Sequence, residues 1–82
     1  NKIDLTGNAK QKEQQIREAL AKRPQGVIIR KNNKQVAVAY LDKSGNIKIN
    51  DPSIKNGANL DISKSSFKKY TNIDFVTTID KK

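Results

Sequence analysis

The fold is decided by residues 35–50, QVAVAYLDKSGNIKIN, in which strand, turn and strand signals follow one another directly. Val36, Val38 and Tyr40 alternate with Ala37, Ala39 and Leu41. A glycine-containing turn follows at 42–45, and the alternation resumes at Ile47. Two runs of period 2 around such a turn predict a β-hairpin. We expect the core face of this hairpin to carry Val36, Val38, Tyr40, Ile47 and Ile49. The opposite face would be the floor of a polar cleft, made by Ala37, Ala39, Asn46, Lys48 and Asn50.

A helix is predicted ahead of this hairpin. Residues 9–22 are good helix formers, and Asn8 with Gln11 three positions later matches a capping box. Ile16 and Leu20 give the helix a narrow apolar stripe, which should pack on a sheet. A proline and a glycine shortly after the last helical residue then end the helix and turn the chain.

Further strands complete the predicted fold. Residues 27–31 should pair with 35–41 through a tight asparagine-rich turn, and a proline ends the third strand after residue 50. Beyond it we expect an ordered loop, a short helix at 63–70, and a last strand at 73–79 whose buried side carries Ile73, Phe75, Thr77 and Ile79. The predicted class is α+β, with one N-terminal helix packed on an antiparallel sheet of about four strands, a three-strand meander plus a C-terminal strand.

The composition excludes several classes of chemistry. The chain has 82 residues, enough for one domain with one small core. It contains no Cys and no His, so disulfides, zinc-finger ligation and mechanisms based on imidazole or thiolate are excluded. The formal net charge of +9 predicts affinity for a polyanion. No apolar run is long enough for a membrane span, and because the chain starts at Asn1 we expect it to be a piece of a longer protein.

The candidate site lies on the face that would carry Lys48. Arg30 on a neighbouring strand should point to the same face, and two cations over a floor of small residues would suit a phosphodiester backbone. Asp74 and Thr78 of the last strand complete the candidate catalytic set as proton-transfer and hydrogen-bonding groups. No cofactor motif or metal-binding spacing occurs. The candidate nucleic-acid-binding residues around this set are Lys31, Lys34 and Asn50.

Structural readings of the same residues stay open. The cationic face could be an ordinary solvated sheet face whose lysines guard the edges, and Asp74 with Thr78 could decorate an exposed edge strand. Phe67 and Tyr70 are expected as core anchors, because the chain has only two Phe and two Tyr with which to fill a core. This expectation argues against a single-strand binder built on aromatic stacking.

The order of elements over roughly residues 12–51 resembles a group of small bacterial toxin ribonucleases. The resemblance rests on QQIREALAKRPQGVIIRKNNKQVAVAYLDKSGNIKIND, in which a helix, a Pro/Gly break and a meander follow one another. The group contains barnase, EndoU, colicin-type tRNases and RelE, and in it a helix precedes the sheet that carries the active site. The resemblance implies the C-terminal toxin domain of a contact-dependent inhibition or colicin-like protein, delivered into the cytoplasm of a target cell. Some members work without a catalytic histidine, so a chain without His fits the group.

The leading prediction is therefore a ribonuclease toxin domain that uses no metal or other cofactor and acts on RNA, with tRNA as one candidate substrate. Arg30 and Lys48 would hold the scissile phosphate, and Asp74 would accept the proton of the 2′-hydroxyl. A small acidic immunity protein would cover the basic face. Two alternatives stay open. One is a non-catalytic nucleic-acid-binding module, such as the DNA-binding arm of a mobile-element protein, and the other is a basic domain that binds an acidic protein.

Overall fold

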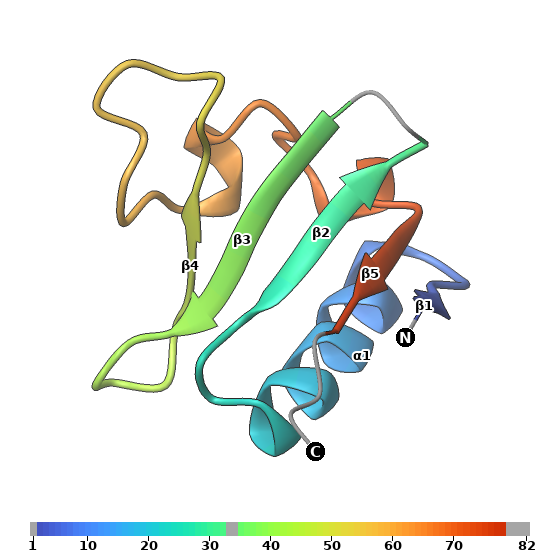
Figure 1. The fold of residues 1–82 in the computed structure, drawn as a ribbon. Helices are drawn as coiled ribbons and strands as arrows, with labels where there is room; N and C mark the ends of the chain where they lie inside the picture. The colour runs from blue at the N-terminus through green and yellow to red at the C-terminus, as the bar shows by residue number, and fades with distance from the viewer. Residues whose placement is uncertain (1, 33–34, 79–82) are drawn as a thin grey trace.

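The computed structural model of the chain describes residues 2–32 and 35–78 (Figure 1). Within these ranges one α-helix packs on a five-stranded antiparallel sheet, which confirms the α+β class with one strand more than expected. No described helix is long and apolar enough to cross a membrane. The elements in chain order are β1 (Lys2–Asp4), α1 (Ala9–Lys22), β2 (Val27–Lys31), β3 (Gln35–Leu41), β4 (Ile47–Asn50), the 3₁₀ turns η1 (Ile62–Lys64) and η2 (Tyr70–Asn72), and β5 (Phe75–Thr77).

The strand order in the sheet is β1-β5-β2-β3-β4. Strands β2, β3 and β4 form the predicted meander, and β5 returns to the other side of β2, where Val76 lies opposite Ile29. The additional strand is the N-terminal arm, whose Ile3 also lies opposite Val76. A strand of three residues carries too little alternation to be recognised from sequence.

Helix α1 has the predicted bounds. The Asn8 side chain accepts from the Gln11 backbone N–H at 3.0 Å, and the Gln11 side chain accepts from the Asn8 N–H at 2.9 Å, so the predicted capping box is confirmed. After the helix the chain turns through Gly26 at φ +118°, a conformation that strains any other residue. The helix buries one stripe, formed by Ile16, Ala19 and Leu20.

The two faces of the sheet are covered differently. Helix α1 and the segment that carries η1 and η2 lie behind one face in Figure 1. The core lies on this side and contains Val27, Ile29, Ala37, Ala39, Ile47, Ile49 and Val76 of the strands. No described helix covers the other face, which we call the open face.

The predicted faces of β3 are exchanged. Ala37 and Ala39 are 1% exposed in the core, whereas Val36 and Val38 are 37% and 38% exposed on the open face. The reason is the pairing across strands, because Ala37 lies opposite Ile29 and Ala39 lies opposite Ile49. Large isoleucines fill the space that the alanines leave, so the layer reaches close packing with the small residues inside. The polar-cleft floor predicted from Ala37 and Ala39 is therefore wrong.

The predicted faces of the last strand are exchanged within β5, whereas Ile73 just before it is buried as predicted. Val76 is fully buried, while Phe75 and Thr77 lie beside the open-face residues Arg30 and Ile28. The strand spans only Phe75–Thr77 of the predicted 73–79, and residue 79 lies outside the described residues. The predicted helix at 63–70 is also wrong, since 3₁₀ turns lie at 62–64 and 70–72 and Lys68 between them has φ +66°.

The expected core anchors are confirmed: Phe67 is 1% exposed, and Tyr70 is half-buried against the core.

The expected ordered loop after β4 is held by a buried carboxylate. Asp51 is 3% exposed, and its two oxygens accept hydrogen bonds from the backbone N–H and hydroxyl groups of Ser53 and Ser66. Further along, Leu60 exchanges two backbone hydrogen bonds with Ile49, at 2.8 and 2.9 Å. The loop is thus fastened at both of its ends to the edge of the sheet.

Candidate functional site

The open face is built from rows of side chains that run across the strands. The pairing register places Lys2, Thr77, Ile28, Val38 and Asn50 in one row. A second row contains Asp4, Phe75, Arg30 and Val36, and Tyr40 and Lys48 lie opposite one another further along β3. Aliphatic residues therefore occupy the middle of the face, with cations at several points around them.

Arg30 is a cation of this face that has no described partner. Its neighbours across the strands are Val36 and Phe75, which carry no charge. The Nε atom is buried and has no hydrogen-bond partner within residues 2–32 and 35–78. A buried N–H without an acceptor costs about 1–3 kcal/mol, so an acceptor that reached this guanidinium would bind favourably. Prediction and structure agree that Arg30 belongs to the open face.

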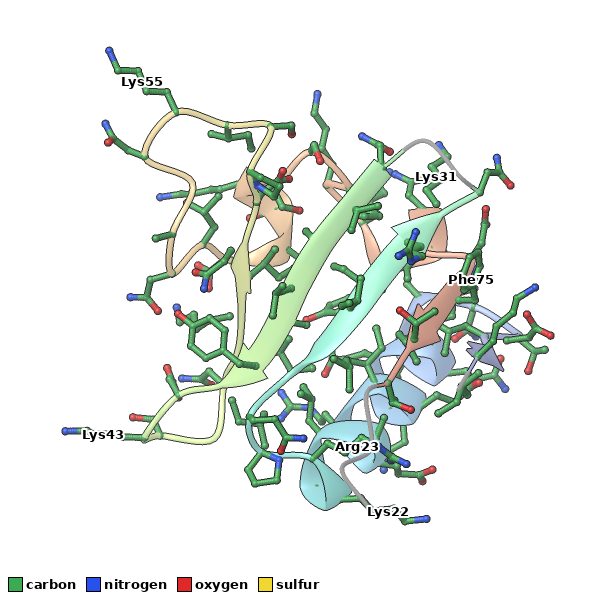
Figure 2. The ribbon with its side chains drawn as sticks, viewed as in Figure 1. Lys22, Arg23, Lys31, Lys43, Lys55 and Phe75 are labelled. Carbon is green, nitrogen blue, oxygen red and sulfur yellow. The ribbon has the colours of Figure 1, made fainter. Side chains whose placement is uncertain are left out.

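Phe75 lies beside Arg30, and a second cation, Lys2, lies over its ring. The Lys2 ammonium lies 4.7 Å from the centroid of the Phe75 ring, within the range of a cation–π contact. Lys2 is also 3.5 Å from the Asp4 carboxylate, and both of these side chains are largely exposed. Such exposed contacts are weak, so Lys2 can leave the ring when a ligand arrives. Figure 2 shows Phe75 on the outer part of the sheet, where β5 runs beside β1.

Thr77, on the same strand as Phe75, adds a second unpartnered polar atom to that of Arg30. Its Oγ1 is buried and has no hydrogen-bond partner among the described residues. Thr77 lies opposite Ile28, two residues before Arg30 on β2, so Thr77 and Arg30 are diagonal neighbours across the β2–β5 pair. Unsatisfied buried groups are rare in proteins, and a change of side-chain conformation would be needed to bring either atom to a ligand.

The predicted residues Lys48 and Asn50 lie on the open face but are engaged by the loop. Lys48 Nζ donates to Asp61 Oδ1 at 2.9 Å, and this bond raises the pKa of Lys48 and lowers the pKa of Asp61. Asn50 Oδ1 accepts from the Asn59 N–H at 2.9 Å. Tyr40 in turn donates to Asn59 Oδ1 at 2.9 Å. These hydrogen bonds hold the loop after β4 against the edge of the sheet.

Arg30 and Lys48 lie on the same face but not side by side, so their joint hold on one phosphate stays a prediction. Arg30 lies opposite Val36, whereas Lys48 lies opposite Tyr40 and one strand further away. Four residues along β3 and two strand spacings place their Cα atoms about 16 Å apart. Lys48 is also held by Asp61.

The other predicted catalytic residues are not on the open face. The Asp74 carboxylate accepts from the Asn32 N–H at 3.0 Å, so it caps the end of β2 instead of facing a substrate. Thr78 is 5% exposed and buried, because it follows the inward-facing Val76 by two residues. The predicted placement of both on the open face is therefore wrong, and their catalytic role stays a prediction.

The remaining predicted nucleic-acid-binding residues are lysines. Lys31 lies opposite Gln35 and alternates with Arg30, which places it on the helix side at the end of β2. Lys34 lies outside the described residues.

The perturbed pKa values do not provide an acid–base pair near neutral pH. Hydrogen bonds, with that from the Asn46 backbone first, lower the pKa of Asp42. Burial tends to raise the pKa of Asp51, but the bonds from Ser53 and Ser66 outweigh it and the pKa is lowered. Burial first, and then Glu13, raises the pKa of Tyr70 to about 12. Together with Lys48 and Asp61, all these shifts move away from neutrality.

Among the described residues no group of His, Cys, Asp and Glu is placed to hold a metal ion. Comparisons of the chain with protein-family models, curated proteins and solved structures find no match. The candidate site described by the structure is the part of the open face around Arg30, Phe75 and Thr77. Sequence reasoning missed Phe75 and Thr77, because it assigned the wrong face of the last strand to the core.

Proposed function

We propose that this domain binds single-stranded nucleic acid along the open face of its sheet and does not cleave it. The observation that carries the proposal is Arg30, whose Nε has no partner among the described residues, beside Phe75 in a chain with a formal net charge of +9. A guanidinium offers forked donors to phosphate oxygens. An aromatic ring with a cation beside it suits a strand whose bases stack while its backbone is neutralised.

The width of the sheet supports a single strand over a duplex. Five strands at a spacing of about 4.8 Å span about 19 Å. The major groove of B-DNA is about 12 Å wide and admits a helix or a two-stranded ribbon. A five-stranded sheet is too broad to enter the groove, whereas unpaired bases can lie flat on it.

Binding is better supported than cleavage. In-line cleavage of RNA without a metal needs a base and an acid near the scissile phosphate. The Asp74 carboxylate accepts from the Asn32 N–H, and Lys48 is held by Asp61. The ribonuclease activity and the acidic immunity protein stay predictions, and the experiment below also tests the former.

The distribution of charge supports moderate, salt-dependent affinity. Figure 2 shows Lys22, Lys31, Lys43 and Lys55 at separate parts of the surface. The described cations of the open face are Lys2, Arg30 and Lys48. Lys48 is held by Asp61, so if Lys2 and Arg30 neutralise phosphates, affinity for a single strand falls about 7-fold between 50 and 200 mM salt.

The test is fluorescence anisotropy with labelled single-stranded RNA, single-stranded DNA and duplex DNA, in EDTA and over this range of salt. We expect both single strands to bind more tightly than the duplex. Arg30→Ala should weaken binding about tenfold or more, the scale for a charged hydrogen-bonding group. Lys43→Ala is the matched control, because it removes one charge from the exposed turn after β3. The proposal fails if no strand binds or if both variants have equal effects. Electrophoresis of the same RNA detects cleavage, and discrete fragments would support the ribonuclease instead.

A further inference from the structure

We infer that the depression beside Thr77 on the open face is a pocket for one nucleobase of the bound strand. This inference rests on the proposed function and adds that the bases, and not only the phosphates, are bound. The depression has a volume of about 260 Å³, enough for a single heterocycle. Its lining residues are Gln25, Gly26, Val27, Ile28, Val38 and Thr77.

The pocket exists because the chain enters β2 without a side chain at Gly26. A Cβ built on this residue would lie 2.9 Å from the Ala39 carbonyl oxygen and 3.3 Å from Val38 Cγ1. The glycine thus lets the backbone approach β3 closely, and Ile28 and Val38 stand beside it as aliphatic walls. An open aliphatic depression with few polar groups is typical of a site that takes the flat face of an aromatic ligand.

Two polar side chains can recognise the edge of a base in this pocket. Gln25 is exposed, and its amide offers both a donor and an acceptor. Thr77 lines the depression, and its hydroxyl has no partner among the described residues. A base supplies both donors and acceptors, which an aliphatic side chain of a protein partner would not.

Arg30 connects the pocket to the phosphate backbone. It follows Ile28 by two residues on the same face of β2, which places its Cα about 7 Å further along the strand. A base that lies over Ile28 and Val38 therefore leaves its own phosphate within reach of the guanidinium. The unmet hydrogen-bonding capacity of Thr77 and of Arg30 would be satisfied by one nucleotide.

The test compares a normal oligonucleotide with an abasic one of the same length, so that the number of phosphates is equal. The normal strand should bind the wild-type domain about tenfold or more tightly than the abasic strand, the scale for one stacked base. Val38→Phe fills the depression from an exposed position and should abolish this ratio. Val36→Phe is the matched control, because Val36 is equally exposed on the same strand but does not line the depression, and it should keep the ratio. Thr77→Val removes the hydroxyl at constant shape and should lower the ratio.

The outcomes separate the two proposals. If neither oligonucleotide binds, the proposed function fails and the pocket fails with it. If both bind with equal affinity in the wild type, the backbone is bound and the base pocket is refuted. A ratio that Val38→Phe and Val36→Phe change equally would also refute it. As a second measurement, adenosine and cytidine monophosphates should shift the backbone NMR signals of Gly26 and Thr77 in the wild type and not in Val38→Phe.

Discussion

Replacement of Asp51 by asparagine should destabilise the protein by about 2–4 kcal/mol at neutral pH. In the native protein Oδ1 accepts from the N–H and hydroxyl of Ser53, and Oδ2 accepts from the N–H and hydroxyl of Ser66. An asparagine keeps one acceptor oxygen and replaces the other by an NH₂ group. The serine hydroxyl on that side can rotate and accept, but the backbone N–H cannot. One buried N–H then loses its partner, at about 1–3 kcal/mol, and the other bonds lose their charge assistance.

The pH dependence of the stability provides a second test of this prediction. The folded pKa of Asp51 is lowered from 3.8, so the carboxylate contributes stability above this pH and loses the contribution as the pH falls through the folded pKa. Urea midpoints of the wild type and Asp51→Asn should therefore differ most near neutrality and converge below pH 3.8. Asp61→Asn is the control, because that carboxylate is exposed and should leave the midpoint almost unchanged. Equal midpoints for the two variants, or a difference that persists in acid, would refute the role of Asp51.

Three further substitutions test the fold and the site. Leu20→Ala, at a fully buried position of α1, should cost about 2–5 kcal/mol in urea unfolding, and an unchanged midpoint would remove the helix from the core. Gly26→Ala should cost at least about 1–3 kcal/mol, because φ +118° strains an alanine and its Cβ would press on the Ala39 carbonyl; retention of full stability would contradict the turn. Lys48→Met should weaken nucleic-acid binding less than Arg30→Met does in anisotropy, because Asp61 already neutralises Lys48; the reverse order would move the site toward β4.

Local signals predicted helix α1 and the turn at 42–45 correctly. The capping box at Asn8 involves groups three residues apart, and the end of α1 follows from a proline and a glycine in the next turn. The meander of β2, β3 and β4 likewise follows from alternation around short turns. The groups that decide these elements lie only a few residues apart in the sequence. The bounds of the elements could therefore be predicted from short stretches of the chain.

The choice of the buried face could not be made locally. In residues 35–41 valine and alanine alternate, and both residue types are apolar, so either face could enter the core. The choice depends on Ile29 and Ile49, which lie opposite Ala37 and Ala39 on neighbouring strands and leave room only for small residues. The larger valines then face outward, and the open face acquires its apolar centre.

The candidate site was affected by the same ambiguity. Arg30 was placed correctly, because Val27 and Ile29 beside it are strongly apolar and point into the core. Phe75 and Thr77 were assigned to the wrong side, since the order Ile73, Phe75, Thr77 alternates as convincingly as the inward set that contains Val76. The contact of Asp51 with Ser66 spans fifteen residues of irregular chain, and no periodic pattern could reveal it.

The most direct test of the central claim is a ¹⁵N NMR titration of the domain with a single-stranded RNA oligonucleotide. The account predicts that the largest shifts occur at backbone amides of β2 and β5, in particular Ile28, Arg30, Phe75 and Thr77. Amides on the outer side of α1, such as Lys10 and Glu18, should stay unchanged. Shifts concentrated on α1 with β2 and β5 unaffected would contradict the claim that the open face binds nucleic acid.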